Sequence, residues 1–197
     1  MAMLLTDEQN MLRDSARSFL QGSAPLDQLR RLRDDASSDG YDRSTWRSMV
    51  ELGWAGVLIP EEHGGVAMGH VAAGVIAEEM GRTLTASPFL STAVMGAVAI
   101  ANNGSASQRE RWLPAIADGS INVAVAVDEY RSHSPALVST TVQSSGRGFR
   151  ISGNKSFVAD GHVADLILVS GRTSGGDKDE NGISLFLVPR DSTGITI

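Results

Sequence analysis

The chain contains no cysteine, few aromatic residues and no long run of apolar residues. The absence of cysteine excludes disulfides, thiolate metal sites and cysteine nucleophiles. No apolar stretch approaches the roughly 20 residues that a membrane-spanning helix needs. The first residues also turn polar too early for a signal peptide. We therefore expect a cytoplasmic protein that has no membrane partner.

Excess positive charge is absent too. The net charge is −6, and neither half of the 197-residue chain has more basic than acidic residues, which argues against a nucleic-acid partner. Hydrophobic residues make up 42% and charged residues 20%, a composition typical of folded globular proteins. The four histidines do not have the spacing of metal ligands, so we predict no metal site.

The first part of the chain has the periodicity of helices. Thr6 and Gln9 have the spacing of a capping box, and apolar residues then recur at helical spacing over residues 7–21. Five more helices are expected: two opened by Pro25 and Ser44, two covering residues 70–81 and 88–101, and one opened by a capping box of Ser107 and Glu110. The helix over residues 88–101 is almost uncharged, which predicts that it is buried.

After Gly119 the apolar residues recur with a period of two, which indicates strands. Strands are expected at residues 123–127, 137–142, 149–151, 157–158, 166–169, 183–188 and 195–197. Gly153 and Asn154 are predicted to form a tight turn. The fold class is therefore α+β and multidomain. Residues 1–118 form an all-α helical bundle, and residues 119–197 form an antiparallel β-barrel-like domain.

Residues 146–169 resemble the flavin-facing hairpin of the acyl-CoA dehydrogenase family. The matching positions are Gly153, Lys155, Phe157, Ala164 and Asp165, whereas Ala159 stands where the family usually has Thr. The helical part resembles the family as well, in residues 52–65, 78–82 and 104–119. The resemblance covers almost the whole chain, and the order and spacing of its motifs make it specific.

This resemblance implies flavin-dependent α,β-dehydrogenation of an acyl-CoA thioester in fatty acid or steroid degradation. It implies FAD as the cofactor, electron-transfer flavoprotein or an equivalent acceptor, and a homo- or hetero-oligomer. The family's catalytic carboxylate lies in a second helical bundle, so no catalytic residue is expected here. Because the sequence stops within a predicted strand, the β-domain is interpreted as truncated at its C-terminal end. An engineered truncation, a proteolytic fragment and one piece of a split protein remain open.

The resemblance also implies site residues. The cofactor-binding set is Val125, Val127, Asp128, Ser134, Phe157 and Ala159. The substrate-binding set is Leu90, Ser91, Met95 and Ser134. Asp128 and Ala159 replace threonines of the family pattern, so two side-chain contacts with the flavin are lost. A carboxylate near the flavin is also expected to oppose its reduction.

Two other functions remain open at this point. The chain could be a non-catalytic partner subunit with a degenerate flavin site, or a flavin monooxygenase of the same fold. Simpler roles remain open for single residues as well. Phe157 could fill the core of the β-domain, and the residues of the helix over 88–101 could serve packing alone.

Overall fold

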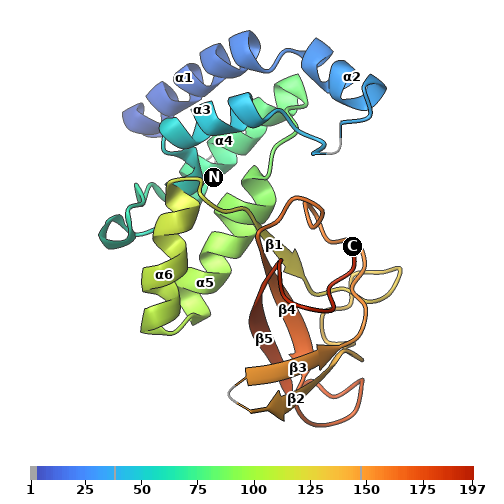
Figure 1. Cartoon of the computed structure of the whole chain (residues 1–197). Helices are drawn as coiled ribbons and strands as arrows, with labels where there is room; N and C mark the ends of the chain where they lie inside the picture. The colour runs from blue at the N-terminus through green and yellow to red at the C-terminus, as the bar shows by residue number, and fades with distance from the viewer. Residues whose placement is uncertain (1–3, 38, 147) are drawn as a thin grey trace. The chain divides into compact units, whose positions relative to one another are not determined.

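A computed structural model describes residues 4–37, 39–146 and 148–197. The chain divides into two compact units, residues 1–120 and residues 121–197 (Figure 1). The first unit is helical and the second is built on a sheet, which confirms the predicted α+β class.

The helical unit contains most of the predicted helices, with bounds shifted by a few residues. Its elements are α1 (Asp7–Ser23), α2 (Leu26–Asp34), α3 (Arg43–Glu51), α4 (Gly69–Thr83), α5 (Ala97–Asn103) and α6 (Ala106–Ala117), together with the short 3₁₀ turns η1 (Trp54–Gly56) and η2 (Glu61–His63). The helix expected over residues 88–101 is divided, because its first part is the π-helical segment η3 (Phe89–Gly96) and its second part is α5.

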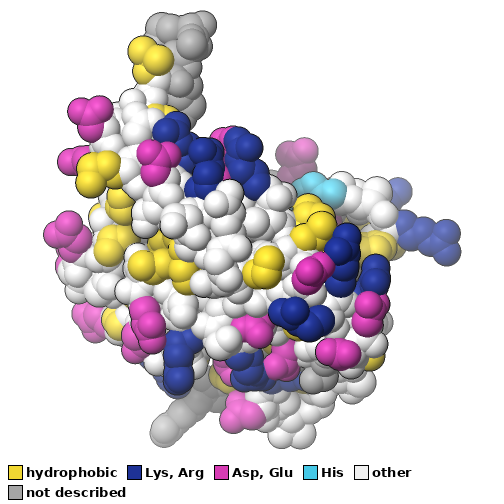
Figure 2. Space-filling model, turned by 90° about the horizontal axis from the view of Figure 1, so that it is seen from above, with side chains coloured by type: hydrophobic (Ala, Val, Ile, Leu, Met, Phe, Trp, Pro, Cys, Tyr) yellow, Lys and Arg dark blue, Asp and Glu magenta, His cyan; other side chains and the backbone are white. Residues whose placement is uncertain are grey.

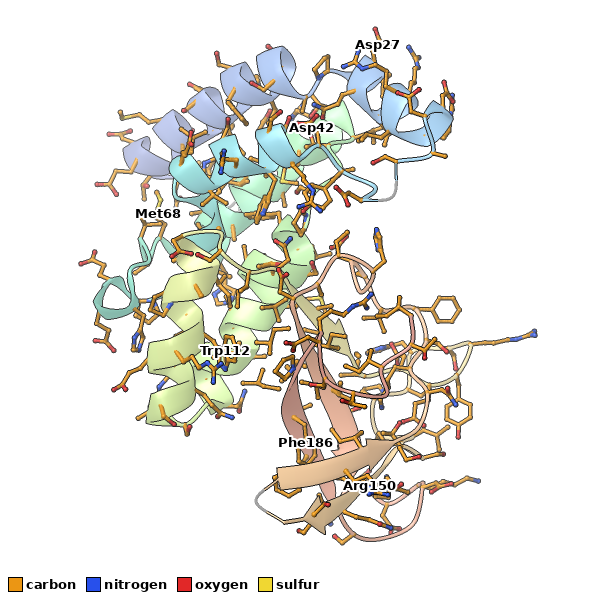
Figure 3. All side chains as sticks on the ribbon, in the orientation of Figure 1. Asp27, Asp42, Met68, Trp112, Arg150 and Phe186 are labelled. Carbon is orange, nitrogen blue, oxygen red and sulfur yellow. The ribbon has the colours of Figure 1, made fainter. Side chains whose placement is uncertain are left out.

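Side-chain caps open α1, α3 and α6, and two predicted caps are wrong. The capping box of Thr6 and Gln9 opens α1 as predicted. At α6 the box is formed by Ser105 and its N3 residue Gln108, two positions before the predicted pair. Asp42, labelled in Figure 3, caps α3 in place of Ser44, because its carboxylate accepts the backbone N–H of Thr45 at 2.7 Å.

The core of the helical unit lies between α1, α4 and the segments that follow them. Leu20, Ile76 and Phe89 are almost completely buried. The ring of Phe19 meets Trp54 edge-on, with 5.5 Å between the ring centroids. These contacts provide the apolar burial that keeps short helices folded.

The β unit is a single five-stranded sheet arranged around β4. Its strands are β1 (Val123–Ala126), β2 (Thr141–Ser145), β3 (Gly148–Ser152), β4 (Leu166–Arg172) and β5 (Ile183–Pro189). Strand β4 pairs parallel with β1 and antiparallel with β5, and it touches β2 in parallel where Thr141 meets Arg172. The sheet is therefore mixed, and it is open among the described residues. It differs in these two respects from the expected antiparallel barrel-like arrangement.

Four details of the predicted β-structure are wrong. The predicted turn at Gly153 and Asn154 is not the hairpin turn, because the hairpin is formed by β2 and β3, in which Ser145 pairs with Gly148. Residues 157–158 form no strand, because the N–H of Ser156 donates to the carbonyl of Asp128 at 2.8 Å and Phe157 then takes a left-handed conformation. Residues 137–140 and 195–197 are also outside the strands.

Gly153 allows the backbone after β3 to approach the backbone at Thr140 closely. A Cβ atom at Gly153 would lie 2.3 Å from Thr140 Oγ1 and 2.7 Å from Thr140 Cα. Only glycine lets the chain leave β3 at this distance from Thr140.

The surface carries both signs of charge. On the face drawn in Figure 2, Lys and Arg side chains are interspersed with Asp and Glu. Among the residues that the structure describes, no helix has the length and apolarity of a membrane span.

Candidate functional site

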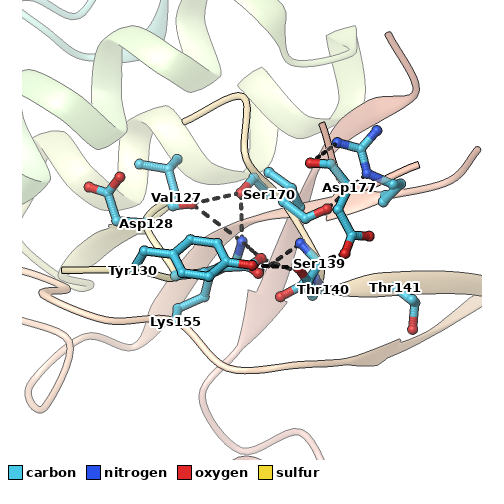
Figure 4. Close-up of polar contacts among 12 residues, drawn as sticks. Val127, Asp128, Tyr130, Ser139, Thr140, Thr141, Lys155, Ser170 and Asp177 are labelled. Carbon is cyan, nitrogen blue, oxygen red and sulfur yellow. Dashed lines mark hydrogen bonds and ion pairs between the residues drawn. The ribbon is translucent and has the colours of Figure 1, made fainter. Parts of the chain in front are cut away.

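A buried ion pair lies where the chain leaves β1. Lys155 Nζ donates to Glu129 Oε1 at 2.6 Å, to Ser170 Oγ at 2.8 Å and to the carbonyl of Val127 at 3.4 Å (Figure 4). The side chains of Lys155 and Glu129 are only 9% and 7% exposed. All three hydrogens of the ammonium group therefore have acceptors, as a buried charge requires.

The carboxylate of this pair also receives backbone hydrogen bonds. Glu129 accepts the N–H of Ser139 at 2.8 Å and the N–H of Thr140 at 3.0 Å. Burial opposes ionisation of the carboxyl, but hydrogen bonds from Lys155, Thr140 and Ser139 outweigh burial and hold the pKa of Glu129 below its usual range. The Glu129–Lys155 pair thus joins the end of β1, the segment before β2, the segment after β3 and the middle of β4.

Asp128 is turned back into its own loop. Its Oδ2 lies 2.9 Å from His133 Nδ1, and its Oδ1 accepts the N–H of Ser134 at 3.0 Å. The hydrogen bond with His133, followed by that with Ser134, holds the pKa of Asp128 below its usual range. Both carboxylate oxygens therefore have partners within residues 133–134.

Phe157 projects from the segment after β3 with an unusual backbone. Its φ is 54°, in the left-handed region, and the residue is 78% exposed. A left-handed bulky residue costs about 1–3 kcal/mol and persists where its surroundings impose it, commonly at ligand sites. The interpretation of Phe157 as a core residue is therefore wrong.

A second exposed aromatic residue offers a contrast within the same unit. Phe149 in β3 is 61% exposed, but its ring packs edge-on against Phe186 of β5, with 5.0 Å between the centroids (Phe186 is labelled in Figure 3). Its backbone is an ordinary strand. Phe149 thus has an intramolecular partner, and it needs no ligand to explain its position.

The structure brings together four of the six positions predicted to bind the cofactor. Asp128 and Ser134 are hydrogen-bonded, the neighbouring carbonyl of Val127 accepts from Lys155, and Phe157 follows the residue that donates to Asp128. Val125 is half-buried in β1, where its partner is Leu168 of β4. Ala159 is exposed, and its methyl group can make no hydrogen bond.

Sequence reasoning missed the residues that brace this arrangement. No role was predicted for Lys155, which matches the family pattern, or for Glu129 and Ser170. The usable signal was that Lys155 and Glu129 are opposite charges beside apolar strand residues, where an ionised side chain needs a partner.

The predicted substrate residues lie in the helical unit on η3. Leu90 and Met95 are 59% and 40% exposed. The hydrogen bonds of a π-helix join residues i and i+5, and this longer turn brings Leu90 and Met95 toward one face. Ser91 points inward instead, since it is 1% exposed and its hydroxyl donates to the carbonyl of Pro88 at 3.2 Å.

The β unit also has an open groove of about 910 Å³. Its lining includes Phe149, Ile151, Phe186 and residues 192–197, whereas neither Asp128 nor Phe157 lines it. Lys155 of the buried ion pair and Val158, the neighbour of Phe157, also line it, so the groove adjoins the cluster around Phe157. Among the described residues, no group of three or more His, Asp or Glu could hold a metal ion.

Family models match both units. The model described as "Acyl-CoA dehydrogenase, N-terminal domain" matches residues 6–120, and the model described as "Acyl-CoA dehydrogenase, middle domain" matches residues 124–197. Together they cover almost the whole chain.

Individual proteins show the same similarity. The chain is 33% identical over 166 residues to the acyl-CoA dehydrogenase FadE12 of Mycobacterium tuberculosis, which covers 83% of this chain and 42% of that protein. It is similar to a crystal structure of the ChsE4-ChsE5 complex from Mycobacterium tuberculosis, with a TM-score of 0.85, 26% identity and coverage of 100% of this chain and 50% of the other. It also resembles an acyl-CoA dehydrogenase complexed with FAD from Bacillus anthracis, with a TM-score of 0.79, 25% identity and coverage of 98% and 33%. The chain spans half or less of the length of each of these proteins.

Proposed function

Because the chain belongs to the acyl-CoA dehydrogenase family of oxidoreductases, we propose that it is part of a flavoprotein that removes two hydrogens from adjacent carbons of an acyl-CoA thioester. The observation that supports its share in this reaction is Phe157, an exposed aromatic residue held in a left-handed conformation beside the end of β1. The chain contributes part of the cofactor and acyl sites.

The residues around Phe157 fit a flat aromatic cofactor such as FAD. The exposed ring of Phe157 offers a face for stacking. The Asp128 carboxylate, in the loop that Ser156 joins to this segment, is engaged by His133 and by the N–H of Ser134. When bound, FAD supplies the electron acceptor of the reaction. The chain's own residues orient the cofactor and keep the charge of Asp128 hydrogen-bonded within the loop.

The base that removes the substrate proton is proposed to lie outside this chain. A carboxylate base near neutral pH works best when its pKa is raised. Hydrogen bonds and nearby cations outweigh burial and hold the pKa below its usual range at the four carboxylates whose pKa values are shifted here, namely Asp42, Glu79, Asp128 and Glu129. These four groups are ion-paired or hydrogen-bonded anions, and they are poor proton acceptors.

The acyl chain is proposed to contact the exposed apolar face of η3. Leu90 and Met95 supply apolar surface on one side of this π-helix. Ser91 is proposed to serve packing, because its hydroxyl is bonded inside its own helix. Substitution of Leu90 or Met95 is therefore expected to change KM for the acyl-CoA more than it changes kcat.

A second candidate is a partner subunit that has a degenerate flavin site. Two observations favour it: Ala159 offers no hydroxyl, and Asp128 places a negative charge near the proposed ring. The similar structure described as the ChsE4-ChsE5 complex is consistent with a partner subunit, because it is itself a complex. On this view a second subunit completes the flavin site.

One experiment separates these functions. The full-length protein is purified alone and with a co-expressed partner, and the visible flavin band is recorded under anaerobic conditions before and after addition of fatty acyl-CoA or steroid acyl-CoA. Bleaching of the band in the protein alone supports the enzyme. A colourless protein that becomes yellow only with its partner supports the subunit role. A flavin that acyl-CoA cannot bleach, but whose reduced form consumes oxygen, would contradict both and indicate a monooxygenase.

A further inference from the structure

We propose that the Glu129–Lys155 pair is a positioning device that holds Phe157 and the end of β1 in the geometry that receives FAD. The inference rests on the proposed function for its ligand, but it rests on this structure for its geometry. The two side chains are less than a tenth exposed, so the pair acts mainly through the residues beside it.

The pair and its neighbours form three successive links between two segments that lie 26 residues apart in the sequence. Lys155 Nζ reaches the carbonyl of Val127 at 3.4 Å, the N–H of Ser156 reaches the carbonyl of Asp128 at 2.8 Å, and Lys155 Nζ reaches Glu129 at 2.6 Å. Phe157 is the next residue after these links. Its position is therefore fixed relative to the end of β1.

The energetics favour positioning over stability as the role of the pair. A buried ion pair is often no more stabilising than apolar residues of the same volume. Its hydrogen bonds are directional, however, and they specify one arrangement of the segments that they join. The left-handed backbone of Phe157 needs such surroundings, since without them its strain is relieved by a return to an ordinary conformation.

The helical unit provides a matched control. Arg17 donates two hydrogen bonds to Glu79 at 3.0 and 2.8 Å, and Glu79 is 1% exposed. This pair also combines a buried carboxylate with a cation, but it joins α1 to α4. Neither residue lies within the segments that carry Asp128 or Phe157.

The test uses four versions of the full-length protein: wild type, Lys155→Met, the double variant Lys155→Met/Glu129→Gln, and Arg17→Met. The Kd for FAD, the visible circular dichroism of bound FAD and the melting temperature are measured for each. The double variant matters most, because it removes both charges and leaves no unpaired ion, so it should recover most of the stability that Lys155→Met loses.

A positioning role predicts that stability and cofactor binding separate. The double variant recovers its melting temperature, but its Kd for FAD stays about tenfold above wild type and the dichroism band of the flavin changes. Arg17→Met leaves Kd within about twofold of wild type. A double variant that recovers both melting temperature and wild-type Kd would overturn the proposal, because the pair would then be structural only.

Failure of the proposed function would look different. If wild type takes up no FAD, alone or with its partner, the proposed ligand is wrong, and the positioning role is decided by hydrogen exchange at the amide of Ser156. Faster exchange of this amide in the double variant at a recovered melting temperature upholds the positioning role. Unchanged exchange overturns it.

Discussion

The two units each bury a glutamate against a cation, but they do so in different ways. In the helical unit Glu79 is 1% exposed while its partner Arg17 is 41% exposed, and Arg82 lies 3.2 Å away as a second cation. In the β unit Glu129 and Lys155 are both less than a tenth exposed, and backbone N–H groups complete the carboxylate. In the first pair the cation is partly exposed to solvent, and a second cation lies beside the carboxylate. In the second pair both side chains are buried, and no other cation pairs with the carboxylate among the residues described.

This difference indicates what each pair does. The hydrogen bonds from Arg17 hold the pKa of Glu79 below its usual range against the opposing effect of burial. These hydrogen bonds come from side chains only, and they connect α1 to α4. The Glu129–Lys155 pair binds main-chain groups from segments without regular structure, so it shapes a surface that no ladder of strand hydrogen bonds could specify.

The largest expected loss of stability comes from breaking the Glu129–Lys155 pair. Lys155→Met leaves Glu129 buried without a cation, and this should cost about 3–5 kcal/mol of stability in the β unit. Arg17→Met should cost clearly less in the helical unit, because Arg82 remains beside Glu79. Because all three tryptophans lie in residues 1–120, fluorescence reports unfolding of the helical unit, while hydrogen exchange of β4 amides reports the β unit. Equal losses would contradict the distinction between the two pairs.

The next largest loss of stability is expected where the backbone at Gly153 approaches Thr140, close to the Glu129–Lys155 pair. Gly153→Ala places a methyl group 2.3 Å from Thr140 Oγ1, so we expect a loss of about 1–3 kcal/mol in β4 hydrogen exchange. Gly148→Ala, in the same strand, is the control, since nothing lies within 4 Å of its added Cβ. If both variants unfold alike, close packing against Thr140 is not what requires glycine at position 153.

Acidification should weaken both units through their buried glutamates. The folded-state pKa values of Glu79 and Glu129 are lowered, so their contributions are complete above the unfolded pKa of about 4.3 and are lost as pH falls through the folded values. Unfolding free energy measured between pH 7 and pH 3 should therefore fall below about pH 4.3. Glu129→Gln should flatten this slope for the β unit and leave that of the helical unit unchanged; a slope unaffected in both would contradict the assignment.

The smallest effect has the opposite sign. Gly74 lies inside α4 with no atom within 4 Å of an added Cβ, so Gly74→Ala should stabilise the helical unit by about 0.5–1 kcal/mol. The gain is measured by guanidinium unfolding followed by tryptophan fluorescence. A loss of stability would show that α4 needs flexibility or close contact at this position.

Sequence reasoning succeeded where structure depends on local pattern. Residues that cap helices and recur at helical spacing predicted α1 and α4, and the apolar runs predicted β4 and β5. The cap of α6 was misplaced because two possible capping boxes overlap, one beginning at Ser105 and one at Ser107. Only the backbone geometry distinguishes them. The parallel pairing of β1 with β4 depends on segments far apart in sequence, and no local pattern encodes it.

The candidate site shows the same limit. The family pattern indicated Phe157 and Asp128, but it could not reveal that Phe157 is left-handed or that Asp128 is held by His133. The ion pair of Glu129 and Lys155 joins residues that are distant in sequence. Such contacts follow from the path of the chain, which is known only once the sheet has formed.

The most direct test of the account compares the two exposed phenylalanines of the β unit. FAD affinity is measured by equilibrium titration for the full-length protein, Phe157→Ala and Phe149→Ala. We predict that Phe157→Ala raises the Kd about tenfold, through loss of the stacking face, whereas Phe149→Ala leaves it unchanged, because its ring is engaged by Phe186. An unchanged Kd in Phe157→Ala, or an equal rise in both variants, would contradict the account.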